Sequence, residues 1–114
     1  MEYTTLERSV LNWMGSHTHI PNLPQQLTVS QPFERKLTGV GSYTKLKVPT
    51  DAQPINTCGI QTPIIGPWIK DAPGIQDDGG SLLFLSEAGY IDTLEIYAIG
   101  YSFDESTTVF RLHD

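Results

Sequence analysis

Residues 79–97, with the sequence GGSLLFLSEAGYIDTLEIY, predict a β-hairpin. Its strands are the runs 81–86 and 90–99, and Glu87-Ala88-Gly89 forms the turn, in which Gly89 suits a position of positive φ. Side chains alternate between the two faces of a strand. Leu94, Ile96 and Ala98 therefore share one face and Thr93, Glu95, Tyr97 and Ile99 share the other. Glu95 follows a core residue in sequence but points away from the core.

A second hairpin is predicted upstream, with strands at 27–37 and 42–49 and a glycine-containing connection, TGVGS, at 38–42. In its second strand one face is charged or polar and the other mainly apolar: Tyr43, Lys45 and Lys47 against Thr44, Leu46 and Val48. This alternation is typical of a strand with one face in water and one on a core. Pro32 cannot donate to a ladder, so its strand is expected at an edge or with a bulge.

The N-terminal segment 4–14 predicts an amphipathic helix. Thr4 and Glu7 have the spacing of a capping box, and Gly15 suits the residue that ends a helix. Its apolar stripe consists of Leu6, Val10, Trp13 and Met14. Residues 16–25 are expected to form a loop with one short turn at 22–26.

Residues 59–70, GIQTPIIGPWIK, carry apolar side chains at a helical spacing, but Pro63 and Pro67 oppose a helix. We expect an irregular or edge strand there, a turn at 77–80 and a short strand at 107–112. Ten glycines and eight prolines in 114 residues also favour a sheet. The predicted fold is α+β, a single domain over residues 1–114, with an N-terminal helix packed on a curved, mainly antiparallel sheet of about five strands.

The charge is unevenly distributed along the chain. Residues 1–70 hold six basic and four acidic side chains, whereas residues 71–114 hold one basic and nine acidic ones, and the net charge is -6. Nucleic acid is a polyanion, so we expect no nucleic-acid binding; a basic protein partner or a cationic small ligand fits better. The single cysteine, Cys58, fits a cytoplasmic protein. We expect neither a signal peptide nor a membrane span.

The residues TGVGSYTKLKVP at 38–49, with the hairpin at 79–97, resemble a family of small uncharacterised bacterial proteins. Members carry a TGVGF-T-F-VP hairpin and a later hairpin ending in LE-Y, after a short N-terminal helix. Such proteins occur on mobile elements, including integron gene cassettes. The resemblance implies an α+β single domain and no particular activity. Ser42 departs from the family, which often has an aromatic residue there, and the usual Trp-Pro of the tail is missing.

Motifs for metal or cofactor chemistry are weak. His17 and His19 lie two residues apart in a predicted loop with no third ligand placed, and Asp77-Asp78-Gly79-Gly80 matches a turn better than a calcium loop. No phosphate-binding glycine loop and no nucleophile motif occurs. We therefore predict no cofactor, no metal and no catalytic residue.

Two groups of residues remain as candidates for function. Thr93, Glu95 and Tyr97 share a strand face and, with Trp68, form a candidate ligand site. The apolar edge segment gives a candidate interface: Ile64, Ile65, Trp68 and Ile69. The leading interpretation is a non-catalytic binding or interaction protein that forms a homo-oligomer. The alternatives are a small-ligand-binding protein or minor enzyme with a cleft around Glu95, Tyr97 and Trp68, and a toxin-neutralising, immunity-like protein.

Overall fold

The structure is a computed structural model that describes residues 1–73, 78–98 and 106–114. Ile99 of the predicted hairpin and Asp77 of the predicted turn lie outside the described residues. The elements are α1 (Thr5–His17), α2 (Leu23–Val29), β1 (Gln31–Leu37), β2 (Gly41–Lys47), β3 (Ile64–Ile65), β4 (Trp68–Lys70), β5 (Gly80–Leu85), β6 (Ile91–Tyr97) and β7 (Arg111–His113).

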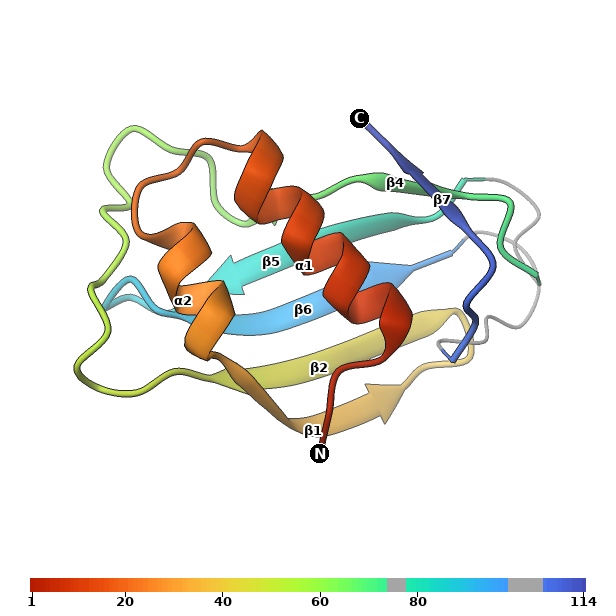
Figure 1. Ribbon diagram of the computed structural model, residues 1–114, viewed down its shortest axis with the longest axis horizontal. Helices are drawn as coiled ribbons and strands as arrows, with labels where there is room; N and C mark the ends of the chain where they lie inside the picture. Colours follow the sequence, from red (N-terminus) through yellow and green to blue (C-terminus); the bar gives the residue numbers. More distant parts are fainter. Residues whose placement is uncertain (74–77, 99–105) are drawn as a thin grey trace.

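Five strands form an antiparallel sheet in the order β1-β2-β6-β5-β3, and β4 and β7 form a separate two-stranded sheet. Both helices lie on the same face of the larger sheet, and α1 runs across its middle strands (Figure 1). The predicted α+β class, with an N-terminal helix on an antiparallel sheet of five strands, is confirmed. The sheet is open, with β1 and β3 at its two edges.

Helix α1 begins as the sequence predicts. The Thr4 hydroxyl accepts a hydrogen bond from the Glu7 backbone N–H at 3.1 Å, and the Glu7 carboxylate accepts one from the Thr4 backbone N–H at 2.9 Å. These two bonds satisfy donors that every helix N-terminus leaves unpaired. The predicted stripe faces the sheet, with Leu6, Val10 and Met14 fully buried, and Leu11 adds to it. Trp13 is half-buried at its margin.

The prediction that α1 ends at Gly15 is wrong, because the helix continues to His17. Gly15 lies where α2 approaches α1 closely, and a Cβ added to it would lie 3.1 Å from Leu27 Cδ1. The small residue therefore serves helix packing and not termination. Residues 27–29, expected in a strand, belong to α2, in whose first turn Pro24 is well tolerated.

The alternation predicted for β2 is confirmed: Thr44 and Leu46 are buried and Tyr43, Lys45 and Lys47 are exposed. Strand β1 lies at an edge, and its register on β2 shifts between Pro32 and Glu34. Both results agree with the expectation from the proline, which cannot complete a ladder.

The hairpin of β5 and β6 supplies the centre of the core. Leu83, Leu94 and Ile96 are at most 1% exposed and face the helices. Gly89 has a φ of 90°, and a side chain there would collide with the backbone of Ile55. The turn thus needs glycine for its backbone conformation and for the close approach of the 50–57 loop.

The irregular edge predicted for residues 59–70 is confirmed. Ile64 and Ile65 form β3 beside β5, and a short irregular turn then leads to β4, where Ile69 makes a bridge to Gly79. Strand β4 pairs with β7, which covers only the last part of the strand predicted at 107–112. Ile69 is fully buried, so this second sheet closes one end of the core.

Candidate functional site

The sheet face opposite the helices, here called the open face, is not covered by any helix or strand of the described residues. The strand registers place one row of side chains straight across it: Lys36, Tyr43, Glu95, Leu82 and Ile65, one from each strand from β1 to β3. A second row beside it consists of Glu34, Lys45, Thr93 and Phe84. Neighbours within a row lie directly opposite each other and interact.

The open face is divided into a charged half and an apolar half. On β1 and β2, Lys45 and Glu34 form an exposed ion pair of 3.7 Å, with Lys36 beside it. On β5 and β3 the outward side chains are apolar: Leu82 and Phe84 are half-buried and Ile65 is 54% exposed. An apolar group of this kind on a protein surface is a common place for a partner to bind.

Glu95 lies between the two halves. Tyr43 lies directly opposite it on β2, and hydrogen bonding to the Glu95 carboxylate, together with the negative charge of that carboxylate, raises the pKa of Tyr43 above its ordinary value. On the same strand Tyr97 lies directly over Gly80, where a side chain would collide with the phenol ring. Because glycine leaves that space free, the phenol ring can occupy it.

The predicted ligand site is split between two sheets. Thr93, Glu95 and Tyr97 do share the outward face of β6, and each is half-buried. Trp68 lies on β4, opposite His113 of β7. Four hollows on the described part of the chain are lined by residues other than these four.

The predicted interface residues divide by strand alternation. Ile64 and Ile69 are 3% and 0% exposed and belong to the core, whereas Ile65 and Trp68 are 54% and 42% exposed. The two buried isoleucines point into the core, so the residues next to them point away from it. Of the four, Ile65 and Trp68 are the two that a partner can reach.

Among the carboxylates that the structure describes, the one with the most hydrogen-bond partners is one that the sequence pattern does not mark as a candidate site. The Glu7 side chain is fully buried, and Arg35 donates to both of its oxygens, from Nε to Oε2 at 2.8 Å and from Nη2 to Oε1 at 2.6 Å. Thr44 Oγ1 donates to Oε2 at 2.7 Å, in addition to the capping bond from Thr4. Four donors thus surround one carboxylate.

Burial by itself would raise the pKa of Glu7, but the hydrogen bonds from Arg35, Thr4 and Thr44 outweigh it and hold the pKa below its ordinary value. The sequence held one signal for this site, because Thr44 is a polar residue on the predicted core-facing side of its strand. Arg35 was not identifiable, since it faces inward only after the register shift in β1.

The histidines do not gather into a site. The His17 ring stacks on Trp13 with a centroid distance of 4.3 Å, and His113 Nε2 lies 3.3 Å from an Asp78 carboxylate oxygen that also pairs with Lys70. Within the described ranges no group of three His, Cys, Asp or Glu side chains is placed to hold a metal ion. Nor does any helix in that part of the chain have the length and apolar character needed to cross a membrane.

Comparisons with protein-family models, with curated proteins and with solved structures found no match to this chain.

Proposed function

We propose that the protein is a non-catalytic interaction protein that self-associates through the apolar half of its open face. The observation that carries this proposal is the group of outward apolar side chains on β5 and β3, which consists of Leu82, Phe84 and Ile65. The exposed Trp68 follows shortly after Ile65 in the chain, on β4 of the second sheet. Sheet faces are ordinarily polar where they meet water. Closed symmetric homodimers are the commonest oligomers, which favours a second copy as the partner.

The arrangement of charge supports the same surface. Lys36, Lys45 and Glu34 lie on the far strands, so the apolar half can be buried without removing these charged groups from water. Glu95 lies at the boundary, where its interaction with Tyr43 can persist at the rim of an interface. An apolar centre with a polar rim is the usual anatomy of a protein interface.

The surroundings of Glu7 and Glu95 support the proposal that the protein is not catalytic. The contacts of Glu7 with Arg35 and Thr44 hold the helix on the sheet, and the contact with Thr4 caps the helix. The lowered pKa of Glu7 keeps it ionised rather than ready to transfer a proton near neutral pH. Glu95 has Tyr43 and Leu82 opposite it on β2 and β5, and neither is a second carboxylate with which it could divide two proton-transfer roles.

We further propose that the protein is a bacterial accessory protein of the kind carried on mobile elements and that it acts in the cytoplasm. The motif resemblance at 38–49 and 79–97 supports the first statement. The exposed thiol of Cys58, which is stable as a free thiol in a reducing compartment, supports the second.

The test is light scattering coupled to size exclusion on the wild type, Ile65→Glu and Trp68→Ala. We expect a wild-type dimer or larger species, and we expect both variants to be monomers with unchanged circular dichroism. Leu37→Glu is the matched control, because Leu37 is 58% exposed but lies on the opposite edge strand; it should still associate. A wild type that is monomeric at high concentration, or equal dissociation by all three variants, would contradict the proposal.

A further inference from the structure

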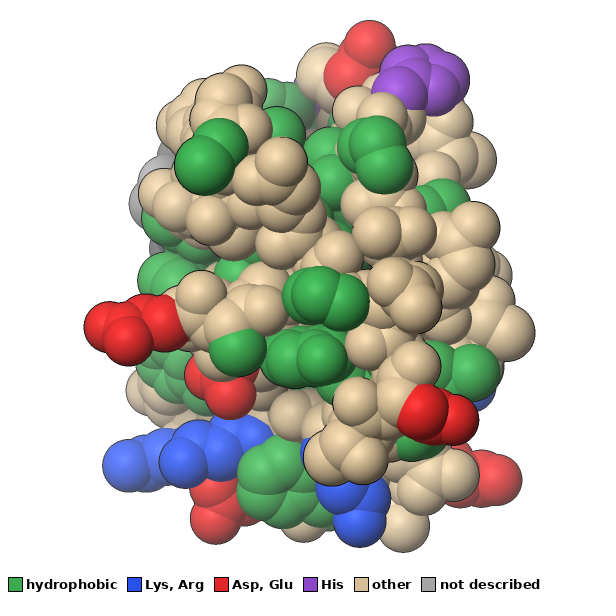
Figure 2. All heavy atoms as spheres, turned by 90° about the vertical axis from the view of Figure 1, so that its left-hand side faces the viewer, with side chains coloured by type: hydrophobic (Ala, Val, Ile, Leu, Met, Phe, Trp, Pro, Cys, Tyr) green, Lys and Arg blue, Asp and Glu red, His purple; other side chains and the backbone are tan. Residues whose placement is uncertain are grey.

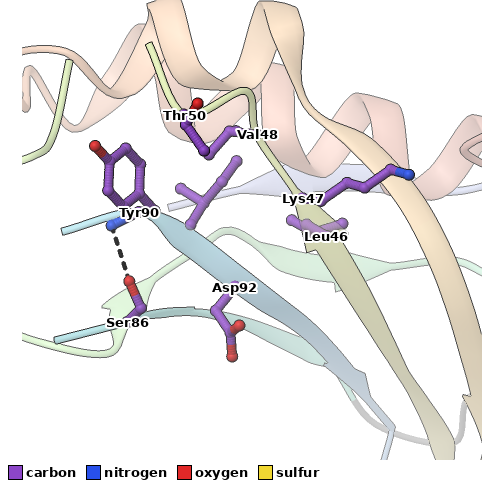
Figure 3. Close-up of a pocket in the computed structure, with 8 residues that line it drawn as sticks. Leu46, Lys47, Val48, Thr50, Ser86, Tyr90 and Asp92 are labelled. Atoms are coloured by element: carbon purple, nitrogen blue, oxygen red, sulfur yellow. Dashed lines mark hydrogen bonds between the residues drawn. The ribbon is translucent and has the colours of Figure 1, made fainter. Parts of the chain in front are cut away.

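The larger sheet divides at one end. The pairing of β2 with β6 ends at Lys45 and Thr93, yet β2 continues along β1 as far as Lys47, and β6 continues along β5 as far as Ile91. A hollow of about 260 Å³, here called the fork pocket, opens between the diverging strands (Figure 3).

Two features of the chain separate the strands. Strand β6 has a bulge at Asp92, because Phe84 pairs with Thr93 whereas Leu85 pairs with Ile91. Bulges bend the strand that carries them. Beyond the bulge, the Ile91 backbone N–H donates to Gln26 Oε1 of α2 at 2.9 Å, so this part of β6 is held by the helix.

One side of the fork pocket is held in place by hydrogen bonds within the protein. Gln26, fully buried, also donates from Nε2 to the carbonyl oxygens of Gln53 at 2.8 Å and Gly89 at 3.0 Å. The turn beside the pocket is closed by hydrogen bonds between Ser86 and Tyr90, including one from the Tyr90 N–H to Ser86 Oγ at 3.2 Å. A preformed site loses little conformational entropy on binding.

The floor of the fork pocket is apolar and its rim is polar. Leu46 and Ile91 are buried in the floor, and Val48 forms a wall that is shared with an adjoining hollow of about 310 Å³. The Tyr90 ring stands on the other side of the pocket, near Thr50 (Figure 3). A cavity of roughly 150 Å³ accommodates benzene, so one or two fused rings are the appropriate size for this pocket.

Carboxylates slightly outnumber cations among the residues that line the pocket or adjoin a lining residue in sequence. Asp92 and Lys47 are the one carboxylate and the one cation of the lining. The exposed Asp51 and Glu87 each directly follow a lining residue, whereas Lys45, which precedes Leu46, is paired with Glu34. The view onto this end of the molecule has hydrophobic side chains in the middle, acidic groups at both sides and basic groups along the lower edge (Figure 2). A surplus of carboxylates raises the local concentration of cations.

We infer that the fork pocket binds a small amine with an aromatic body of one or two rings, with the ring on Leu46, Val48 and Ile91 and the ammonium near Asp92. This inference is independent of self-association, because the site lies at the end of the sheet where β2 and β6 separate. An exposed ion pair adds little to affinity, so the amine contributes selectivity and the buried ring contributes most of the affinity.

The test is a two-dimensional amide NMR titration of the labelled protein with tryptamine, indole and indole-3-acetate in parallel. We expect tryptamine to shift the amide signals of Ser86, Tyr90 and Asp92, with the affinity order tryptamine, then indole, then indole-3-acetate. Asp92→Asn should weaken tryptamine binding about threefold and leave indole unchanged. Asp114→Asn, which removes an exposed carboxylate just after β7, is the matched control and should bind as the wild type does.

A second variant tests whether the ligand binds in the fork pocket. Thr50→Trp places a large ring at the mouth of the pocket from an exposed loop position, so it should abolish the shifts while the protein remains folded. Absence of saturable shifts at millimolar tryptamine, shifts centred on other residues, or equal affinity for all three probes would each overturn the inference. Retained binding in Thr50→Trp would also overturn it.

Discussion

Two carboxylates meet consecutive residues of β2 from opposite faces of the same sheet. Glu7 accepts a hydrogen bond from Thr44 under the helices, and Glu95 lies opposite Tyr43 on the open face and raises its pKa. Glu7 is fully buried and has a guanidinium partner, whereas Glu95 is half-buried and has a neutral phenol. The same side-chain chemistry therefore serves two purposes, which the environment on each face decides.

The two carboxylates differ in how the protein compensates for their lost hydration. A buried carboxylate is tolerated only when a charge and several hydrogen bonds replace its water, and Arg35, Thr4 and Thr44 provide this for Glu7. Glu95 keeps part of its hydration and needs no such partners. We therefore expect changes around Glu7 to alter stability, and changes around Glu95 to alter titration and binding.

The largest effect should follow from Arg35→Met. This change leaves the buried Glu7 carboxylate without its cation, and we expect a loss of about 3 kcal/mol in the free energy of unfolding, measured by urea denaturation. Lys45→Met breaks only the exposed pair with Glu34 and should cost less than about 0.5 kcal/mol. Similar losses in the two variants would remove the basis of the contrast.

The next effect is a dependence on pH. The pKa of Glu7 is lower in the folded protein than in the unfolded chain, so its contribution is complete above the ordinary value of 4.5 and is lost as the pH falls through the folded pKa. We expect the urea concentration at the unfolding midpoint to decrease as the pH is lowered below 4.5. This decrease should be less steep in Glu7→Gln than in the wild type. Glu95→Gln should show the same dependence of the urea midpoint on pH as the wild type. A weaker dependence in Glu95→Gln would mean that Glu95, and not Glu7, causes the acid sensitivity.

A smaller effect is expected from a comparison of two neighbouring residues of β2. Thr44→Val and Tyr43→Phe should differ in their effect on the free energy of unfolding. Thr44→Val removes a donor to a buried carboxylate and should cost about 2 kcal/mol in the free energy of unfolding. Tyr43→Phe changes an exposed hydroxyl and should leave the urea midpoint unchanged. Equal midpoints for the two variants would mean that the Thr44 bond contributes nothing.

The smallest effect concerns the titration of Tyr43. Glu95→Gln removes the acceptor charge that raises the pKa of Tyr43, so this pKa should fall toward its ordinary value. Phenolate absorbance measured against Tyr43→Phe isolates this one tyrosine among five. An unchanged pKa would show that the two side chains are not in contact in solution.

The elements that the sequence predicts well are those in which local pattern and burial agree. The alternation of β2 and the Gly89 turn of the second hairpin are of this kind. The local pattern misses the role of Gly15, which serves contact with Leu27, and the burial of Ile64 and Ile69 within the apolar edge segment. Each of these features depends on a distant element that approaches the residue, which no local pattern records.

The candidate sites were less predictable than the fold. The outward row containing Glu95 follows from alternation, but its partner Tyr43 depends on the register between β2 and β6, which lie far apart in the chain. The fork pocket depends on the bulge at Asp92 and on Gln26, which the sequence marks only as a polar residue at the end of the short turn expected at 22–26.

The central position of β6 has a consequence for synthesis on the ribosome. The hairpin of β1 and β2 emerges early, but the strand that completes its inner edge is β6, near the end of the chain. Chains are made at roughly 5–20 residues per second, so the edge of β2 stays unpaired for several seconds. During that interval Lys45 places a positive charge on the unpaired edge, and edge lysines are a feature by which finished sheets avoid pairing with other chains.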